Sequence, residues 1–174
     1  SALRGRKVML HFEGIMGKSK IWLNGVLLKE NFGSYFPIHI DLSEHLNYNG
    51  TNVIAVRADN STDPDFPPGK AQETLDFTYF GGIYRDAWLI THNKTFITPP
   101  LAVDKVAGGG IFVHYEDLSE ASSRVHVELD IANEDQAKTV NISLSLKDKN
   151  GNLASQVKTQ VALPEQGSKA VALE

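Results

Sequence analysis

The sequence contains no cysteine among its 174 residues. This absence excludes a disulfide framework, a thiolate zinc site and a cysteine nucleophile. No apolar run approaches the roughly 18 residues that a membrane-spanning helix requires. Residues 1–7 also lack the apolar centre of a signal peptide. We therefore expect no membrane partner.

Positive charge is also scarce, with 17 Lys and Arg against 21 Asp and Glu and a formal net charge of -4. Nucleic-acid binding rests mainly on Lys and Arg side chains that neutralise phosphates, and no basic cluster stands out here. The cluster Gly108-Gly109-Gly110 precedes a strand-like run and lacks the Lys-Ser/Thr of a phosphate-binding loop. We therefore predict neither a nucleic-acid partner nor a cofactor.

The six histidines are scattered, and no Gly-x-Ser-x-Gly motif is present. The spacings His-x-x-x-His and His-x-His, which favour metal binding within one segment, are both absent. Four of the histidines fall in strand-like runs, where we expect surface or half-buried side chains: His11, His39, His114 and His126. The spacing therefore predicts no metal site.

Short runs of alternating apolar and polar residues, separated by turn residues, dominate the sequence and indicate antiparallel β-structure. The clearest hairpin joins residues 18–23 to 26–29 through Asn24-Gly25, two residues that accept the positive φ values of a type I′ turn. We expect Trp22 and Trp88 in the core. No helix of ordinary length is predicted, so the fold class is all-β.

The segment Thr98-Pro99-Pro100 is the predicted domain boundary, because proline fixes φ and restrains the residue before it. We predict one domain over residues 1–98 and a second over residues 99–174. Beyond the boundary the apolar residues of 125–131 and 140–146 alternate regularly, which is typical of an immunoglobulin-like sandwich.

A long polar stretch over residues 59–74 lies between two predicted strands, and such loops are usually functional or mobile. Asp76 follows it, close in sequence to Phe77, Tyr79 and Phe80. A carboxylate beside aromatic rings suits a sugar, whose hydroxyls donate to the oxygens while its C–H face packs on the rings. Spacing alone favours the alternative, an aspartate that caps the loop by accepting hydrogen bonds from backbone amides.

Four ordered motifs over residues 8–90 resemble glycoside hydrolase family 2, which includes β-galactosidases, β-glucuronidases and β-mannosidases. The motifs are Asp76 to Leu89 (DFTYFGGIYRDAWL), residues 10–15 with 21–25, residues 36–42 and residues 52–57. The Gly-Gly-Ile-Tyr-Arg-Asp form is most similar to the β-galactosidases.

The resemblance implies an N-terminal sugar-binding domain, a galactose-binding-like jelly-roll sandwich, followed by an immunoglobulin-like β-sandwich and a catalytic (β/α)8 barrel. The expectation is then a jelly roll truncated at its N-terminus and a second sandwich truncated at its C-terminus. The family's two catalytic glutamates lie in the barrel, so the resemblance implies an excised, inactive piece with no catalytic residue. The parent would be a bacterial hydrolase of terminal β-galactosides, either periplasmic or cytoplasmic, and the barrel would be the partner of this piece.

The resemblance also gives Asp76 a role in the full-length enzyme. An aspartate six residues before the second motif glycine, here Gly82, accepts hydrogen bonds from hydroxyls of the terminal sugar. Tyr79 and Phe80 are candidates to line the interface with the barrel, and core packing is the alternative for both.

Four further motif residues are expected to be structural. Gly81 and Gly82 would supply positive φ or a close backbone approach. Arg85 would bond carbonyl groups and pair with Asp86, locking the turn.

Three alternatives remain open: an autonomous carbohydrate-binding module, a fragment of a β-glucuronidase or β-mannosidase, and a purely structural sandwich. Incomplete sandwiches expose unpaired strand edges, which invite association with another chain. We therefore expect a homo-oligomer formed through edge strands.

Overall fold

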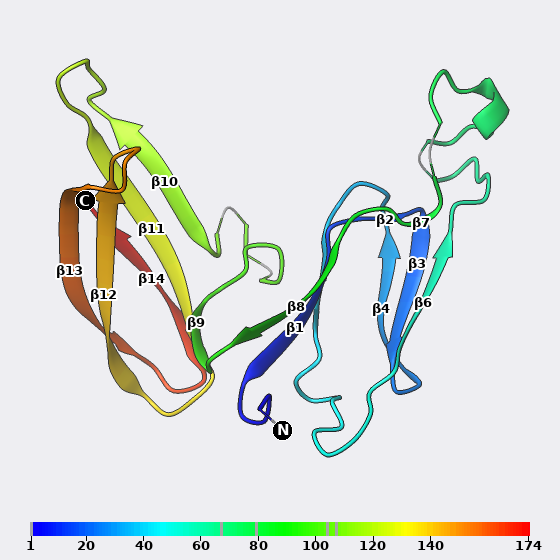
Figure 1. The fold of residues 1–174 in the computed structure, drawn as a ribbon, viewed down its shortest axis with the longest axis horizontal. Helices are drawn as coiled ribbons and strands as arrows, with labels where there is room; N and C mark the ends of the chain where they lie inside the picture. Colours follow the sequence, from blue (N-terminus) through cyan, green and yellow to red (C-terminus); the bar gives the residue numbers. More distant parts are fainter. Residues whose placement is uncertain (1, 67, 79, 104, 107) are drawn as a thin grey trace. The chain divides into compact units, whose positions relative to one another are not determined.

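The computed structural model describes residues 2–66, 68–78, 80–103, 105–106 and 108–174 (Figure 1). Within these ranges the chain consists of strands β1 to β14 and one short 3-10 helix, η1 (Gln72–Thr74). The predicted all-β fold class is confirmed. None of the described segments forms a helix long and apolar enough to cross a membrane.

The chain divides into two compact units, Ser1–Asn93 and Lys94–Glu174, called here the first and the second unit. The division precedes the predicted connector Thr98-Pro99-Pro100. The reason is β9 (Thr95–Ile97), which pairs with β11 and so joins the second unit.

The first unit contains two antiparallel three-stranded sheets, ordered β5-β1-β8 and β4-β3-β6, and a small β2-β7 pair. The strands of the first sheet are β1 (Lys7–Phe12), β5 (Ile38–Asp41) and β8 (Ala87–His92). Those of the second are β3 (Lys18–Leu23), β4 (Val26–Phe32) and β6 (Ile54–Asp59). The short pair is β2 (Ile15–Met16) and β7 (Gly82–Ile83).

The core of the first unit follows from the period of two in its strands, because alternate side chains point to the same face of a sheet. Val8, Leu10 and Phe12 of β1 and Ile21 and Leu23 of β3 are buried in one hydrophobic cluster. The predicted hairpin is confirmed, since β3 pairs with β4. The two turn residues between them both have positive φ, 52° at Asn24 and 86° at Gly25.

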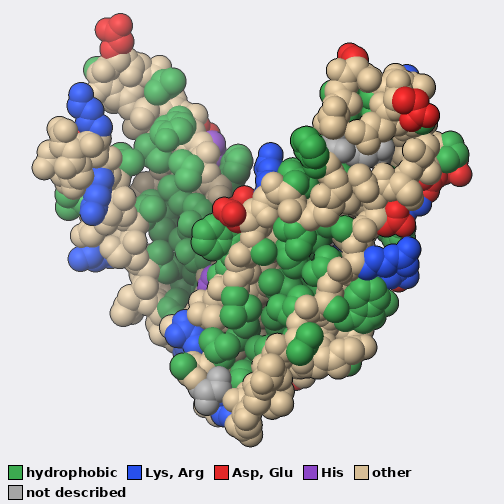
Figure 2. Space-filling model, turned by 45° about the vertical axis from the view of Figure 1, so that its right-hand side comes forward, with side chains coloured by type: hydrophobic (Ala, Val, Ile, Leu, Met, Phe, Trp, Pro, Cys, Tyr) green, Lys and Arg blue, Asp and Glu red, His purple; other side chains and the backbone are tan. Residues whose placement is uncertain are grey.

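Two edge strands of the first unit, β6 and β8, leave inward-facing side chains uncovered. Leu89 lies opposite the buried Leu10 but is 54% exposed, and Ile54 lies opposite the buried Leu23 but is 42% exposed. Hydrophobic side chains also reach the surface elsewhere on the molecule (Figure 2). The expectation that Trp88 lies in the core is wrong, because its ring on β8 is half exposed and its Nε1 donates to Glu13 Oε1 at 2.9 Å.

The second unit contains the sheet β10-β11-β14, with β9 also paired to β11, and the separate hairpin β12-β13. The sheet strands are β10 (Ile111–Glu116), β11 (Arg124–Asn133) and β14 (Gly167–Leu173). The hairpin strands are β12 (Lys138–Lys147) and β13 (Leu153–Leu163). Val127, Leu129 and Ile131 are buried in one cluster, as their alternation predicts.

One buried amide joins three segments of the second unit. Asn133 is fully buried, and its Nδ2 donates to the carbonyl of Pro164 at 2.7 Å and to that of Gln136 at 2.9 Å. Its Oδ1 accepts a hydrogen bond from Thr95 Oγ1 at 2.9 Å. The turn after β11, the turn after β13 and strand β9 therefore meet at a single side chain.

A buried carboxylate connects the start of the second unit to β11. Asp130 is 5% exposed and accepts hydrogen bonds from Thr98 Oγ1 at 2.7 Å and Lys105 Nζ at 2.6 Å. Thr98 Oγ1 also accepts the amide of Gly110 at 3.0 Å. Burial raises the pKa of Asp130, but the hydrogen bonds from Lys105 and Thr98 outweigh burial and hold the pKa below its ordinary value.

We predict that Asp130→Asn lowers the free energy of unfolding of the second unit by about 1.5–3 kcal/mol at pH 7, because charge-assisted hydrogen bonds are lost. The pKa of Asp130 is lower in the folded protein than in the unfolded chain. Its stabilising contribution is therefore present above about pH 4 and disappears as pH falls through the folded-state pKa. Amide hydrogen exchange in β11 at pH 7 and pH 3 measures the difference.

The matched control is Glu128→Gln, which changes an exposed carboxylate on the same strand and should leave exchange in β11 unchanged. If the difference in β11 amide exchange between wild type and Asp130→Asn stayed constant down to pH 3, the stabilisation could not come from the ionised carboxylate of Asp130.

Candidate functional site

The long loop between β6 and β7 presents Asp76 to solvent. The carboxylate of Asp76 is exposed and has no hydrogen bond or ion pair with any other residue that the structure describes. Phe77 and Phe80 beside it are 50% and 74% exposed. No capping bond to a described backbone amide engages Asp76, so its oxygens are free to accept hydrogen bonds.

Tyr79 and Phe80 were the two candidates to line the interface with the barrel, with core packing as the alternative. Phe80 does not pack in the core, because its side chain is largely exposed. Tyr79 lies outside the described residues.

The first residues of the loop are held against the start of β3. Lys18 forms an ion pair with Asp63, and its Nζ lies 5.6 Å from the centre of the Phe66 ring. The bond from Lys18, followed by one from the backbone of Asp65, holds the pKa of Asp63 below its ordinary value. Two hydrogen bonds from Ser61 hold the pKa of Asp59 below its ordinary value.

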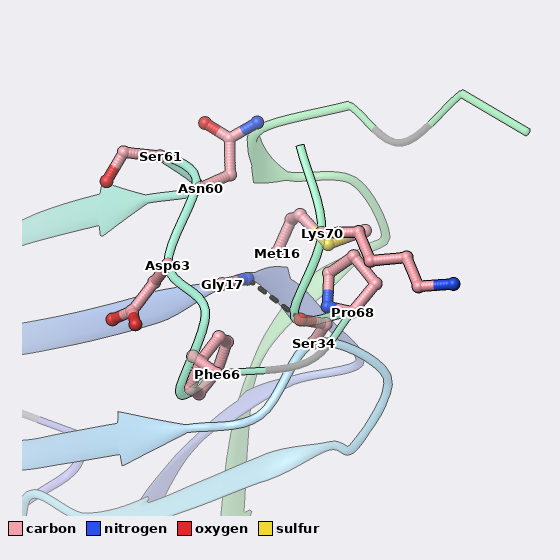
Figure 3. A pocket seen from close by; sticks show the side chains of 9 residues that line it. All are labelled: Met16, Gly17, Ser34, Asn60, Ser61, Asp63, Phe66, Pro68 and Lys70. Atoms are coloured by element: carbon pink, nitrogen blue, oxygen red, sulfur yellow. Dashed lines mark hydrogen bonds between the residues drawn. The ribbon is translucent and has the colours of Figure 1, made fainter. Parts of the chain in front are cut away.

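A small hollow lies at this attachment point (Figure 3). The amide of Gly17 donates to Ser34 Oγ at 3.2 Å within it, where β2 ends. Nine residues line the hollow: Met16, Gly17, Ser34, Asn60, Ser61, Asp63, Phe66, Pro68 and Lys70. Ser34 bonds to Gly17 and Tyr84, and Ser61 and Asp63 bond to residues beside the hollow, so we interpret the hollow as the base that supports the loop.

Glycines permit the close approach of backbone segments at this base. Gly17 has a φ of 85°, and a Cβ added there would lie 2.1 Å from the carbonyl oxygen of Asp59. A Cβ added at Gly81 would lie 2.7 Å from Asn60 Oδ1. Gly82 has a φ of 84°, with open space around it. Gly81 therefore provides space for the first loop residue, whereas Gly82 provides the backbone conformation.

The aromatic residue of the Gly-Gly-Ile-Tyr-Arg-Asp motif anchors the other end of the loop, which the sequence did not indicate. Tyr84 donates its hydroxyl to the carbonyl of Ser34 at 2.8 Å. A Cβ added at Gly14 would lie only 2.6 Å from the Tyr84 ring, so glycine is needed there as well. The far end of the loop is therefore bonded to the carbonyl of Ser34, while the hydroxyl of Ser34 accepts the amide of Gly17, the residue that closely approaches Asp59 at the near end of the loop.

The expected ion pair between Arg85 and Asp86 is absent from the contacts of the described residues. The Arg85 guanidinium lies instead over the Tyr84 ring, 5.7 Å from its centre. Asp86 contributes its backbone carbonyl, which accepts the amide of Glu13 at 3.0 Å.

Residues 1–93 match the family model described as glycosyl hydrolases family 2, sugar binding domain. A β-glucuronidase of Formosa agariphila is 34% identical over 167 residues, which are 92% of this chain and 17% of that relative. A β-galactosidase of Thermoanaerobacter pseudethanolicus is 40% identical over 95 residues, 54% of this chain and 12% of that relative.

The solved structure of a β-glucuronidase from glycoside hydrolase family 2 superposes with a TM-score of 0.84 at 28% identity. The match covers 97% of this chain and 18% of that one. The chain thus corresponds to less than a fifth of each of these three proteins.

We predict that Gly17→Ala lowers the free energy of unfolding of the first unit by about 2–5 kcal/mol, since strain at positive φ adds to a clash with rigid backbone. Gly25→Ala is the matched control, because its φ of 86° is nearly the same but no atom lies within 4 Å of the added Cβ. The control should cost only about 1–2 kcal/mol. Urea unfolding followed by tryptophan fluorescence reports the first unit, which holds both Trp22 and Trp88. Equal losses in the two variants would show that the contact with Asp59 is unimportant.

Proposed function

The chain belongs to glycoside hydrolase family 2, and from this premise we propose that it is a non-catalytic, substrate-contacting part of an enzyme that hydrolyses terminal β-glycosides. The match of residues 1–93 to the family's sugar binding domain supports this proposal. The reaction proposed for the whole enzyme is retaining hydrolysis through a covalent glycosyl intermediate. The two carboxyl groups that this reaction needs would be supplied by the catalytic barrel, the partner of this chain.

Asp76 is the residue that we propose contacts the sugar. The observation that supports this role is its exposed carboxylate, which has no partner among the described residues and is close in sequence to the exposed side chains of Phe77 and Phe80. A carboxylate accepts hydrogen bonds from two neighbouring sugar hydroxyls, and the rings suit the apolar face of a sugar. The ion pair of Lys18 with Asp63 at one end and the hydrogen bond of Tyr84 to Ser34 at the other limit how far the loop base can move.

A terminal β-galactoside is the first candidate substrate, because the motif around Gly82 resembles β-galactosidases and one relative carries that name. A terminal β-glucuronide is the second candidate, since the relative that matches 92% of this chain is a β-glucuronidase. Nitrophenyl β-galactoside and nitrophenyl β-glucuronide, assayed side by side on the enzyme that carries this chain, separate the two.

In that enzyme we predict that Asp76→Asn lowers kcat/KM by about 10- to 150-fold. The reason is the loss of charge-assisted hydrogen bonds to the substrate, worth about 1.5–3 kcal/mol. The control is Asp65→Asn, which neutralises another exposed aspartate of the same loop and should leave kcat/KM unchanged. An Asp76→Asn enzyme with wild-type kcat/KM on both substrates would refute the assigned role.

The 174-residue chain by itself should show no turnover of either nitrophenyl glycoside. Calorimetry should detect millimolar or weaker binding of galactosides, because a few exposed hydrogen bonds do not offset the cost of association. Micromolar, saturable binding would favour an autonomous carbohydrate-binding module instead.

We also propose that the isolated chain associates through the edges of the first unit. Leu89 of β8 and Ile54 of β6 face inward yet are exposed, and unpaired strand edges template association. Sedimentation at high concentration should show a dimer or larger species, and Leu89→Lys should shift the equilibrium toward monomer. Glu44→Gln, at an exposed turn, raises the net charge by the same single unit and should have no effect. A strictly monomeric wild-type chain would contradict this proposal.

A further inference from the structure

Strand pairing in the second unit brings together two histidines and a glutamate, a cluster that no short spacing in the sequence reveals. His114 of β10 lies directly opposite His126 of β11. The two imidazole rings are stacked, with centroids 4.8 Å apart and planes inclined by 7°. Glu116 lies two residues beyond His114 and therefore on the same face of the sheet. One ligand atom from each of these three residues lies within 4.8 Å of the other two.

We propose that His114, Glu116 and His126 form a binding site for a divalent transition-metal ion of the zinc class. This site lies in the second unit, whereas the sugar-contacting loop lies in the first. The proposal therefore concerns neither the proposed substrate site nor the proposed reaction.

The ring nitrogens of the cluster include donors without partners. His126 Nε2 lies 3.2 Å from Glu116 Oε2, yet it makes no hydrogen bond with acceptable geometry. His114 Nδ1 is likewise buried and without a hydrogen-bond partner among the described residues. His114 Nε2 lies 4.0 Å from Glu116 Oε1. An ion that accepts a lone pair from each ring would satisfy groups that the protein leaves unpaired.

A second carboxylate orients His126. Its Nδ1 lies 3.1 Å from Glu174 Oε1, and Glu174 follows the last paired residue of β14. When Nδ1 carries the proton for this contact, Nε2 keeps a lone pair that is available to a metal ion. Metal-binding histidines commonly have this arrangement, in which a carboxylate bound to one ring nitrogen fixes the tautomer and raises the basicity of the other.

The composition of the cluster indicates which ions it would bind. Imidazole suits zinc, copper and nickel, whereas magnesium and calcium prefer sites built from oxygen alone. Bond lengths of about 2.0–2.2 Å place the ligand atoms of a tetrahedral zinc site roughly 3.3 Å apart. Binding therefore requires the cluster to contract, and His114 must turn out of the stack because parallel rings cannot both direct an in-plane lone pair at one ion. His114 and Glu116 are only partly buried on the edge strand β10, which permits that rotation.

Two factors oppose the binding of a metal ion: a nearby guanidinium group and competition from protons. Arg124 Nη1 lies 4.0 Å from Glu116 Oε2, although another nitrogen of the same guanidinium lies closer to Asp117, at 3.2 Å. Protons also compete, because a charged His126 between Glu116 and Glu174 would form an ion-paired triad without metal. Direct metal titration distinguishes the metal-bound cluster from this metal-free, ion-paired triad.

The test is calorimetric titration of the untagged 174-residue chain with ZnCl2 at pH 7.5, in a buffer that does not bind metal. We expect one Zn²⁺ per chain and no binding of Mg²⁺ at the same concentrations. His114→Gln and Glu116→Gln should each raise the dissociation constant at least tenfold. Glu174→Gln, which acts through His126, should raise it about tenfold. The matched control His45→Gln alters an exposed turn histidine and should bind zinc as wild type does.

Thermal unfolding gives an independent readout. Zinc at a hundredfold excess over the dissociation constant should raise the unfolding midpoint of the second unit by on the order of 10 °C. EDTA should reverse the increase. Glu116→Gln should abolish the increase without unfolding the unit, because this side chain is exposed.

Three results would overturn the proposal. The first is the absence of both binding heat and stabilisation at about 1 mM Zn²⁺, a concentration at which even a site with a millimolar dissociation constant would be partly occupied. The second is zinc binding that is undiminished in both His114→Gln and Glu116→Gln. The third is binding lost in His11→Gln, which would assign the ion to the other cross-strand pair, His11 and His39, whose rings are 4.2 Å apart.

Discussion

The first unit depends on a close approach between two backbone segments, Gly17 and the carbonyl of Asp59. Only glycine adopts the required φ without a side chain that would meet the opposite backbone. Because this contact lies where β6 ends, it determines where the long loop leaves the sheet. The ion pair of Lys18 with Asp63 then attaches the first part of the loop to the same place. Without this contact, the loop that carries Asp76 would have no fixed origin.

The chain illustrates how a glycoside hydrolase can divide binding from chemistry. In our proposal the sandwich positions a loop, and the loop offers the carboxylate of Asp76 for binding rather than a catalytic pair. Such an arrangement would add hydrogen bonds to a substrate that is held elsewhere, so its contribution would depend on the barrel with which we propose it acts. The second unit is organised differently, around the buried Asp130 and Asn133, whose polar bonds fix its connections.

Much of the fold was predictable because alternation along a strand is a local property. The hairpin at Asn24-Gly25 and the buried face of β11 follow directly from neighbouring residues. Trp88 was assigned wrongly because it lies opposite His11, on the face of β8 that does not point to the core, and the local pattern does not report which face the core covers. The role of Tyr84 was missed since its partner, Ser34, is distant in sequence. The cross-strand pairing of His114 and His126 was hidden for the same reason, because register relates residues that no short motif connects.

Asn133 sets a requirement on the sequence of the second unit. Its amide nitrogen donates to the turn after β11 and to the turn after β13, while its oxygen accepts a hydrogen bond from β9. All of its hydrogen bonds are made only when these three segments are in place together. Aspartate cannot replace this residue, since it offers no N–H to the two carbonyl groups.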